Sequence, residues 1–213
     1  MKFSKGAWAI GAILFVLIAD QILKIYIKTH LMLFEEIRIT KWFIIRFVEN
    51  NGMAMGIEVI EKSFLSLFRI IASFAIVYYL FRIVKRDFKL GYIICISLIF
   101  AGAIGNIIDC IFYGVIFDHS GYFGDSYGKV AMLFPPDGGY STWLHGKVVD
   151  MFYFPLFETV WPSWIPYVGG TPFIFFSYIF NVADASISIG VALLLLFYRK
   201  TFSLSFEKKK IEA

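Results

Sequence analysis

Four apolar runs dominate the pattern of the chain, and each is long enough to cross the roughly 30 Å hydrocarbon core of a bilayer as a helix. We therefore predict four transmembrane helices in one integral membrane domain, residues 1–213. The predicted helices cover about residues 7–27, 64–83, 90–113 and 173–198. The basic N-terminus resembles a secretory signal peptide, but the first run is too long and no small-x-small site follows it, so we expect this helix to be retained.

Two longer segments, residues 34–61 and 114–172, contain no run that is apolar enough to span. Within the first, residues 37–43 and 44–48 are rich in β-branched and aromatic side chains with partial alternation, which predicts short strands. The second is rich in Gly, Pro, Tyr and Trp, which favours irregular structure. The predicted fold class is an all-α membrane protein with four transmembrane helices, a small extramembrane β element and a long periplasmic or interfacial insertion.

Composition agrees with a membrane protein, because 59% of the residues are hydrophobic and 17% are charged. Soluble domains average about 25% charged residues. The net charge of +4 comes from basic residues at the ends of the apolar runs, so we expect no nucleic-acid partner. Under the positive-inside rule, these basic residues predict that both termini are cytoplasmic. The segments 34–61 and 114–172 then lie on the outer face.

Neither the cysteines nor the histidines indicate a metal or disulfide site. Cys95 and Cys110 lie in one predicted helix, roughly 22 Å apart along its axis. That separation is too large for a disulfide. The three histidines show no metal-ligand spacing, so we expect no metal.

Carboxylates and amides interrupt three of the four apolar runs. A carboxylate in hydrocarbon costs about 2.5–3.5 kcal/mol on insertion scales, so such residues indicate a functional site. On the predicted topology they fall at a similar depth near the outer face, beside polar residues from the two outer segments. The pairs Asn106–Asp109 and Asn181–Asp184 are each spaced to share one helical face. The full set is Asp20, Lys24, Asn106, Asp109, Asn181 and Asp184, with Asn50 and Asp150 from the outer segments.

Facing aspartates suit the activation of water for hydrolysis. Two carboxylates at close range cannot both ionise, so one stays protonated while the other accepts a proton from water. No Ser-His-Asp, Cys-His or HExxH arrangement occurs at this depth, which argues against serine and zinc hydrolysis. A proton-coupled transporter also uses intramembrane aspartates, but it predicts inverted repeats and a site near the midplane, and neither is visible.

Five segments, in this order along the chain, resemble the motifs of the bacterial lipoprotein signal peptidases, the type II signal peptidases. Any one motif is weak, but five in order on four predicted helices are specific. The resemblance covers the chain apart from its long outer insertions. The segments are Asp20-Gln21 with Lys24, Asn50-Asn51-Gly52-Met53-Ala54-Met55, Gly102-Ala103-Ile104-Gly105-Asn106-Ile107-Ile108-Asp109, Val148-Val149-Asp150-Met151 and Phe180-Asn181-Val182-Ala183-Asp184.

The resemblance implies an aspartic endopeptidase of the bacterial cytoplasmic (inner) membrane. Such an enzyme removes the signal peptide from a diacylglyceryl-modified prolipoprotein, just before the lipidated cysteine. The resemblance also implies Asp150 and Asp184 as the catalytic dyad, no cofactor, contact with membrane lipid, and inhibition by the peptide antibiotic globomycin. The supporting residues that it implies are Asn50, Gly52, Asn106 and Asn181 at the substrate site, Asp109 as a structural carboxylate, and Asp20 with Lys24 as a brace.

The chain departs from the family pattern at three places. Cys110 stands where the family usually has arginine, so a contact of that arginine is expected to be missing or replaced. Met151 stands where phenylalanine is usual, and the segment from Asp109 to Asp150 is longer than in the family. From the residues alone, Asp109 with Asp184 is an alternative dyad, and a proton-coupled transporter is the alternative function.

Overall fold

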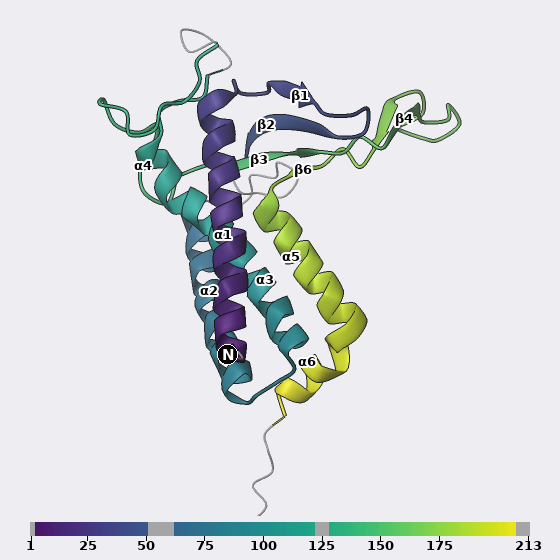
Figure 1. Ribbon diagram of the computed structural model, residues 1–213. Coiled ribbons are helices and arrows are strands. Elements are labelled where there is room, and N and C mark those ends of the chain that lie inside the picture. Colours follow the sequence, from purple (N-terminus) through teal and green to yellow (C-terminus); the bar gives the residue numbers. More distant parts are fainter. Residues whose placement is uncertain (1–2, 51–61, 122–127, 208–213) are drawn as a thin grey trace, which may run out of the picture.

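The computed structural model describes residues 3–50, 62–121 and 128–207. In this part of the chain, four helices are long and apolar enough to cross a membrane, as the apolar runs predict (Figure 1). These spans are Lys5–His30, Ser66–Lys85, Leu90–Ile116 and Val182–Ser205. The helical elements are α1 (Lys5–His30), α2 (Lys62–Lys85), α3 (Leu90–Ile108), η2 (Asp109–Tyr113), α4 (Gly114–Ile116), α5 (Val182–Leu193), η4 (Leu194–Tyr198) and α6 (Arg199–Ser205).

The fourth helix begins later in the structure than the sequence predicts. We expected it over residues 173–198, but α5 begins at Val182, and the preceding residues form short strands instead. These strands are β5 (Pro172–Phe175) and β6 (Ile179–Phe180). Hydrophobicity alone does not separate a strand from a buried helix in a short apolar run, which is why the prediction merged them.

Strands form two antiparallel sheets, so the all-α description holds only for the spanning part. The larger sheet has the order β1-β2-β3-β6, and β4 (Phe157–Val160) pairs with β5. In the four-stranded sheet, β1 (Glu36–Arg38) and β2 (Ile44–Asn50) lie where the sequence predicts two strands, although β1 is shorter than predicted. The strand β3 (Val148–Tyr153) lies in a segment for which we expected irregular structure. The residues of β3 are almost all buried, so the strand lacks the alternation that marks a half-exposed one.

Helix α3 is the centre of the bundle and packs against α1, α2 and α5. Small residues allow this close approach. A Cβ atom added at Gly102 would lie 2.2 Å from the backbone oxygen of Ala183, and one at Gly105 would lie 2.8 Å from Asp20 Oδ2. The two glycines therefore set how closely α5 and the Asp20 carboxylate approach α3.

Basic residues gather at one end of the bundle. The start of α1, the end of α2, the start of α3 and helix α6 all lie at the end away from the four-stranded sheet (Figure 1). Lys5, Lys85, Arg86 and Lys89 belong to this end. Both cysteines are buried free thiols.

A buried ionic cluster joins α1 and β2 to the long insertion that follows α4. Lys28 and Glu49 form an ion pair with almost no solvent exposure, and Ser120 Oγ lies 2.9 Å from Lys28 Nζ and 3.0 Å from Glu49 Oε1. Lys147 Nζ completes the cluster at 3.1 Å from Glu49 Oε2. The Lys28 ammonium also lies 5.1 Å from the centre of the Tyr140 ring. The insertion is therefore tied to the strand that ends at Asn50.

We expect Glu49→Gln to destabilise the fold by about 1–3 kcal/mol, because it leaves the buried Lys28 ammonium without a charged partner. Burial alone raises the pKa of the Glu49 carboxyl, but Lys28 and Lys147 outweigh burial and hold that pKa below its ordinary value. The stabilisation is thus present above the usual glutamate range and is lost as pH falls through the lowered pKa. Thermal unfolding in detergent at several pH values measures it.

The matched control is Glu36→Gln, since Glu36 forms a partly exposed ion pair with Arg46 at 3.3 Å. Exposed pairs of this kind contribute about 0–1 kcal/mol. Equal losses for the two variants would contradict a structural role for the buried cluster.

Candidate active site

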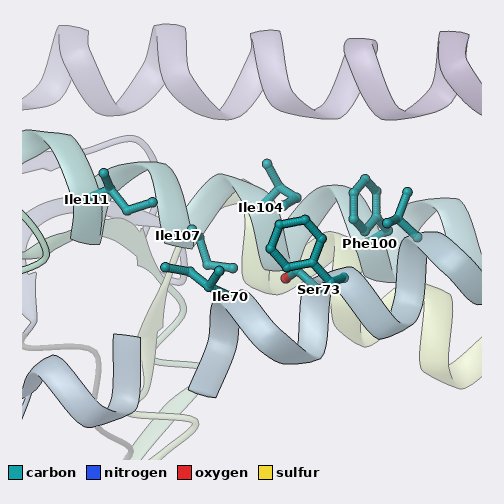
Figure 2. Close-up of a pocket in the computed structure, with 8 residues that line it drawn as sticks. Ile70, Ser73, Phe100, Ile104, Ile107 and Ile111 are labelled. Atoms are coloured by element: carbon teal, nitrogen blue, oxygen red, sulfur yellow. The ribbon is translucent and has the colours of Figure 1, made fainter. Parts of the chain in front are cut away.

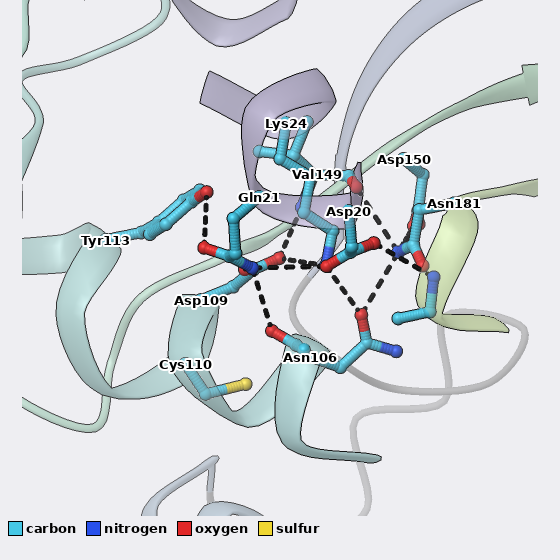
Figure 3. Close-up of polar contacts among 12 residues, drawn as sticks. Asp20, Gln21, Lys24, Asn106, Asp109, Cys110, Tyr113, Val149, Asp150 and Asn181 are labelled. Carbon is cyan, nitrogen blue, oxygen red and sulfur yellow. Dashed lines mark hydrogen bonds and ion pairs between the residues drawn. The ribbon is translucent and has the colours of Figure 1, made fainter. Parts of the chain in front are cut away.

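The polar residues of α1, α3 and α5 meet beneath β2 and β3, near the end of the bundle that carries the four-stranded sheet (Figures 1 and 3). Lys24 is at the centre of this layer. Its Nζ lies 2.9 Å from Asp20 Oδ2 and 2.7 Å from Asp109 Oδ2, and all three side chains are completely buried. It also donates to Asn106 Oδ1 at 2.9 Å. Asp20 and Lys24, four residues apart on α1, thus form an ion pair that extends to Asp109 at the end of α3.

Gln21 and Tyr113 belong to the same network, although the sequence pattern assigned neither of them a role. Gln21 Nε2 donates to Asp109 Oδ1 at 3.0 Å, and its Oε1 accepts from the Tyr113 hydroxyl at 3.1 Å. The sequence signal for Gln21 was its place beside Asp20 in an apolar run. Tyr113 had no such signal in the sequence. Its position depends on the π-helical turn η2, which the hydrophobic pattern does not predict.

Two carboxylates of this network reach the segments that carry Asp150 and Asp184. Asp20 Oδ1 accepts from the backbone N–H of Ala183 at 2.9 Å, at the positive end of the α5 dipole. Asp109 Oδ2 accepts from the backbone N–H of Val149 at 3.3 Å. The brace thus fixes the backbone immediately before each of these aspartates.

Asp150 lies on β3 and is 2% exposed. Its Oδ2 accepts from Asn50 Nδ2 at 3.0 Å and its Oδ1 from Asn181 Nδ2 at 2.7 Å. Burial, followed by the negative charge of Asp184, raises the pKa of the Asp150 carboxyl to about 7, although the two asparagine hydrogen bonds oppose the increase. Asp150 and Asp184 therefore interact electrostatically.

Asp184 occupies the first turn of α5. Its backbone N–H donates to Asn181 Oδ1 at 2.9 Å, and its Oδ2 accepts from the Asn181 backbone N–H at 3.4 Å, which is a capping box. Its other oxygen accepts from Asn106 Nδ2 at 2.8 Å. The prediction that Asn181 lies inside the helix was wrong: Asn181 is the N-cap, because its short side chain satisfies an otherwise unpaired N–H of the first turn.

Asn181 contacts residues of the site from three elements, α3, β3 and α5. Besides Asp150 and Asp184, its side chain contacts Asn106 Oδ1 at 3.1 Å. Eight of the nine predicted site residues are thus joined in one network of contacts, namely Asp20, Lys24, Asn50, Asn106, Asp109, Asp150, Asn181 and Asp184. The remaining predicted residue, Gly52, lies outside the described residues.

Cys110 stands where the family usually has arginine, and an arginine from another helix lies beside it. Arg69 of α2 places Nη1 3.6 Å from Cys110 Sγ. A guanidinium from another helix therefore lies beside this position, and that it replaces the contact of the family's arginine stays a prediction. Among the residues that the structure describes, no group of three His, Cys, Asp or Glu side chains is arranged to hold a metal ion.

Residues 12–200 match the family model for signal peptidase (SPase) II. A lipoprotein signal peptidase from Porphyromonas gingivalis is 52% identical over 98% of this chain and 90% of its own length. One from Amoebophilus asiaticus is 30% identical, over 96% of this chain and 84% of its own length.

Solved structures agree with the sequence matches. A bacterial membrane enzyme solved by the in meso method superposes with a TM-score of 0.59 at 26% identity, over 96% of this chain and 93% of that one. A second has a TM-score of 0.57 at 28% identity, over 88% and 90% of the two chains. These comparisons give no support to the transporter alternative. The chain belongs to the signal peptidase II family.

Proposed function

We propose that the chain removes signal peptides from diacylglyceryl-modified prolipoproteins as an aspartic endopeptidase, cutting just before the lipidated cysteine. Asp150 and Asp184 are the catalytic dyad. The observation that carries this proposal is the pair of interacting carboxylates that β3 and α5 bring together, each held by asparagine side chains. The supporting groups are those of the polar network, and the chemistry needs no cofactor.

Asp109 is less suited to catalysis than Asp150. It is completely buried, forms an ion pair with Lys24, and accepts from Gln21 and Val149. A carboxylate that is paired with a lysine and bonded to the backbone of β3 in this way is suited to a structural role. In the described part of the chain, neither Asp150 nor Asp184 forms an ion pair, so both stay available to exchange a proton.

The dyad acts by general acid–base catalysis. Asp184 accepts a proton from the attacking water, while Asp150 donates a proton to the carbonyl oxygen of the scissile peptide. Amide N–H groups of Asn50 and Asn181 hold Asp150 in place as it changes charge.

We expect kcat/KM to fall as pH rises through about 7, because Asp150 then loses the proton that it donates. Asn50→Ala removes a hydrogen bond that favours the ionised form of Asp150. The alkaline limb of the variant should therefore move to higher pH, even though its maximal rate falls. Rates measured from pH 5 to 9 test both statements.

A limb that stays in place in Asn50→Ala, or moves to lower pH, would show that Asp150 is not the group that titrates. The control is Thr40→Ala, because Thr40 lies on the loop that joins β1 to β2, away from Asp150 in the sequence. Its pH profile should match that of the wild type.

Localisation and partners follow from the same proposal. The basic end of the bundle faces the cytoplasm, so both termini are cytoplasmic and the dyad lies toward the outer face of the inner membrane. Trp164 and Tyr167, between β4 and β5, are highly exposed aromatic side chains that suit the headgroup region of the lipid. Globomycin is the expected inhibitor, by occupying the dyad, and no nucleic acid takes part.

The test is cleavage of a purified prolipoprotein, with and without its diacylglyceryl group, by the wild-type protein in lipid nanodiscs. Mass spectrometry of the product should show a lipidated cysteine as its new N-terminus. Globomycin should suppress the cleavage. If a folded wild-type protein leaves every lipidated precursor intact, the peptidase assignment for this chain fails.

A further inference from the structure

An apolar groove runs between α2 and α3 within the spanning part of the bundle. Its volume is about 230 Å³, and side chains of the two helices point into it from opposite sides (Figure 2). Helix α2 contributes Ile70, Phe74 and Val77, and α3 contributes Phe100, Ile104 and Ile107. At about 1.5 Å per residue, the stretch from Ile70 to Val77 runs roughly 10 Å along the helix axis.

One end of the groove reaches the candidate active site. Ile107 directly follows Asn106, which donates to Asp184, and the lining residue Ile111 directly follows Cys110. The groove therefore starts at the depth of the polar layer. From there it extends toward the basic end of the bundle, the direction that an acyl chain takes from an interface into hydrocarbon.

Arg69 stands at this end of the groove, since it directly precedes the lining residue Ile70. Its guanidinium lies beside Cys110, at the turn η2. The cation is thus close to the mouth of the groove, beside the turn that begins with Asp109. A guanidinium above an apolar groove suits an amphiphile whose oxygen acceptors sit at the interface.

Ser73 gives an independent indication of a ligand. It lines the groove one turn beyond Arg69, is 5% exposed, and its hydroxyl has no hydrogen-bond partner among the described residues. A buried hydroxyl without a partner costs free energy, more so in a bilayer, where no water replaces the partner. An ester carbonyl placed in the groove would accept its hydrogen.

We propose that the groove between α2 and α3 binds one acyl chain of the substrate's diacylglyceryl group, with the ester oxygens toward Arg69 and Ser73. The inference rests on the proposed function, because the substrate supplies the chain. A membrane phospholipid offers the same ester and acyl chemistry. We assign the groove to the substrate because the diacylglyceryl group is attached to the cysteine next to the scissile bond, and the mouth of the groove lies beside the dyad.

The test compares variants that fill the groove with one that does not. Val77→Phe and Ile104→Phe add bulk inside it, whereas Ile71→Phe adds the same bulk on a face of α2 where the side chain is 60% exposed. We expect the two groove variants to raise KM for a diacylated precursor about tenfold or more, with kcat within about twofold of the wild type. The Ile71→Phe variant should match the wild type in both.

A second arm separates the two sources of the chain. Shortening the acyl chains of the precursor should raise KM for the wild type, but have little further effect on Val77→Phe, while the nanodisc lipid stays constant. Arg69→Gln, which adds no bulk, should also raise KM several-fold. Unchanged KM in both groove variants and in Arg69→Gln would overturn the inference and leave the groove to bulk lipid. A wild type that cleaves nothing would instead remove the proposed function, and this inference with it.

Discussion

Asp150→Asn and Asp184→Asn are each expected to lower cleavage of a lipidated precursor by about 10³-fold or more, with the fold retained. Asparagine keeps the size and the hydrogen-bonding capacity of the side chain, but it neither accepts a proton from water nor donates one to a carbonyl oxygen. The amide groups of Asn50, Asn106 and Asn181 now face an amide rather than a carboxylate. Single-turnover cleavage in nanodiscs measures the loss, and thermal unfolding checks the fold.

Asp109→Asn is the matched control, because it is the same substitution at another aspartate of the layer. It weakens the ion pair with Lys24 and the contact with Val149, so it should lower stability and leave partial activity. The double variant Asp150→Asn/Asp184→Asn should be no less active than the singles, since catalytic groups that act as a unit are not additive. Normal cleavage by Asp150→Asn together with an inactive Asp109→Asn would favour the alternative dyad.

The sequence predicted the spanning helices well because length and hydropathy decide them. It also predicted which polar residues meet, since helices of alternating direction place Asp20, Asn106 and Asn181 at one depth. The hydrogen bonds themselves were beyond prediction. Which oxygen of Asp150 meets Asn50 depends on the antiparallel register of β2 and β3, in which Val48 pairs with Asp150 across strands that lie far apart in sequence.

The start of α5 shows where local pattern fails. The run from Phe173 to Phe180 is apolar apart from Ser177 and the Tyr178 hydroxyl, yet residues 179–180 pair with β3 and only then does the chain turn into the helix. Asn181 marks this change, because N-cap residues are polar and short. A helix start signal at Asn181 predicts a helix that begins at Val182, as the structure has it.

The ionic cluster of Lys28 and Glu49, and the guanidinium beside Cys110, had no local signal at all. The ion pair joins residues 21 positions apart in the chain, and Arg69 and Cys110 are 41 positions apart, so only the folded chain brings them together. The long insertion, for which the sequence suggested no role, proves to supply Ser120 and Lys147 to that cluster.

Lys24→Met is expected to destabilise the protein by about 3–5 kcal/mol, the largest loss that we expect from a single substitution in the buried polar layer. The ammonium neutralises two carboxylates, Asp20 and Asp109, in a layer where none of the three side chains is exposed. Methionine fills a similar volume, so the loss comes from leaving two buried carboxylates uncompensated. Asp20 also anchors the first turn of α5 through Ala183, and activity should fall as well. Urea or thermal unfolding in detergent measures the change.

Lys5→Met is the matched control, because it makes the same substitution in the same helix. The Lys5–Asp87 ion pair is 2.7 Å long, but the Asp87 side chain is 83% exposed, and such pairs contribute about 0–1 kcal/mol. Adding Asp109→Asn to Lys24→Met should recover part of the stability, since it removes one of the two unpaired charges. If Lys24→Met unfolds no earlier than Lys5→Met, the charged layer is not what holds α1 against α3. A loss that Asp109→Asn deepens would mean that Lys24 acts through packing, because only an electrostatic role makes the two substitutions compensate.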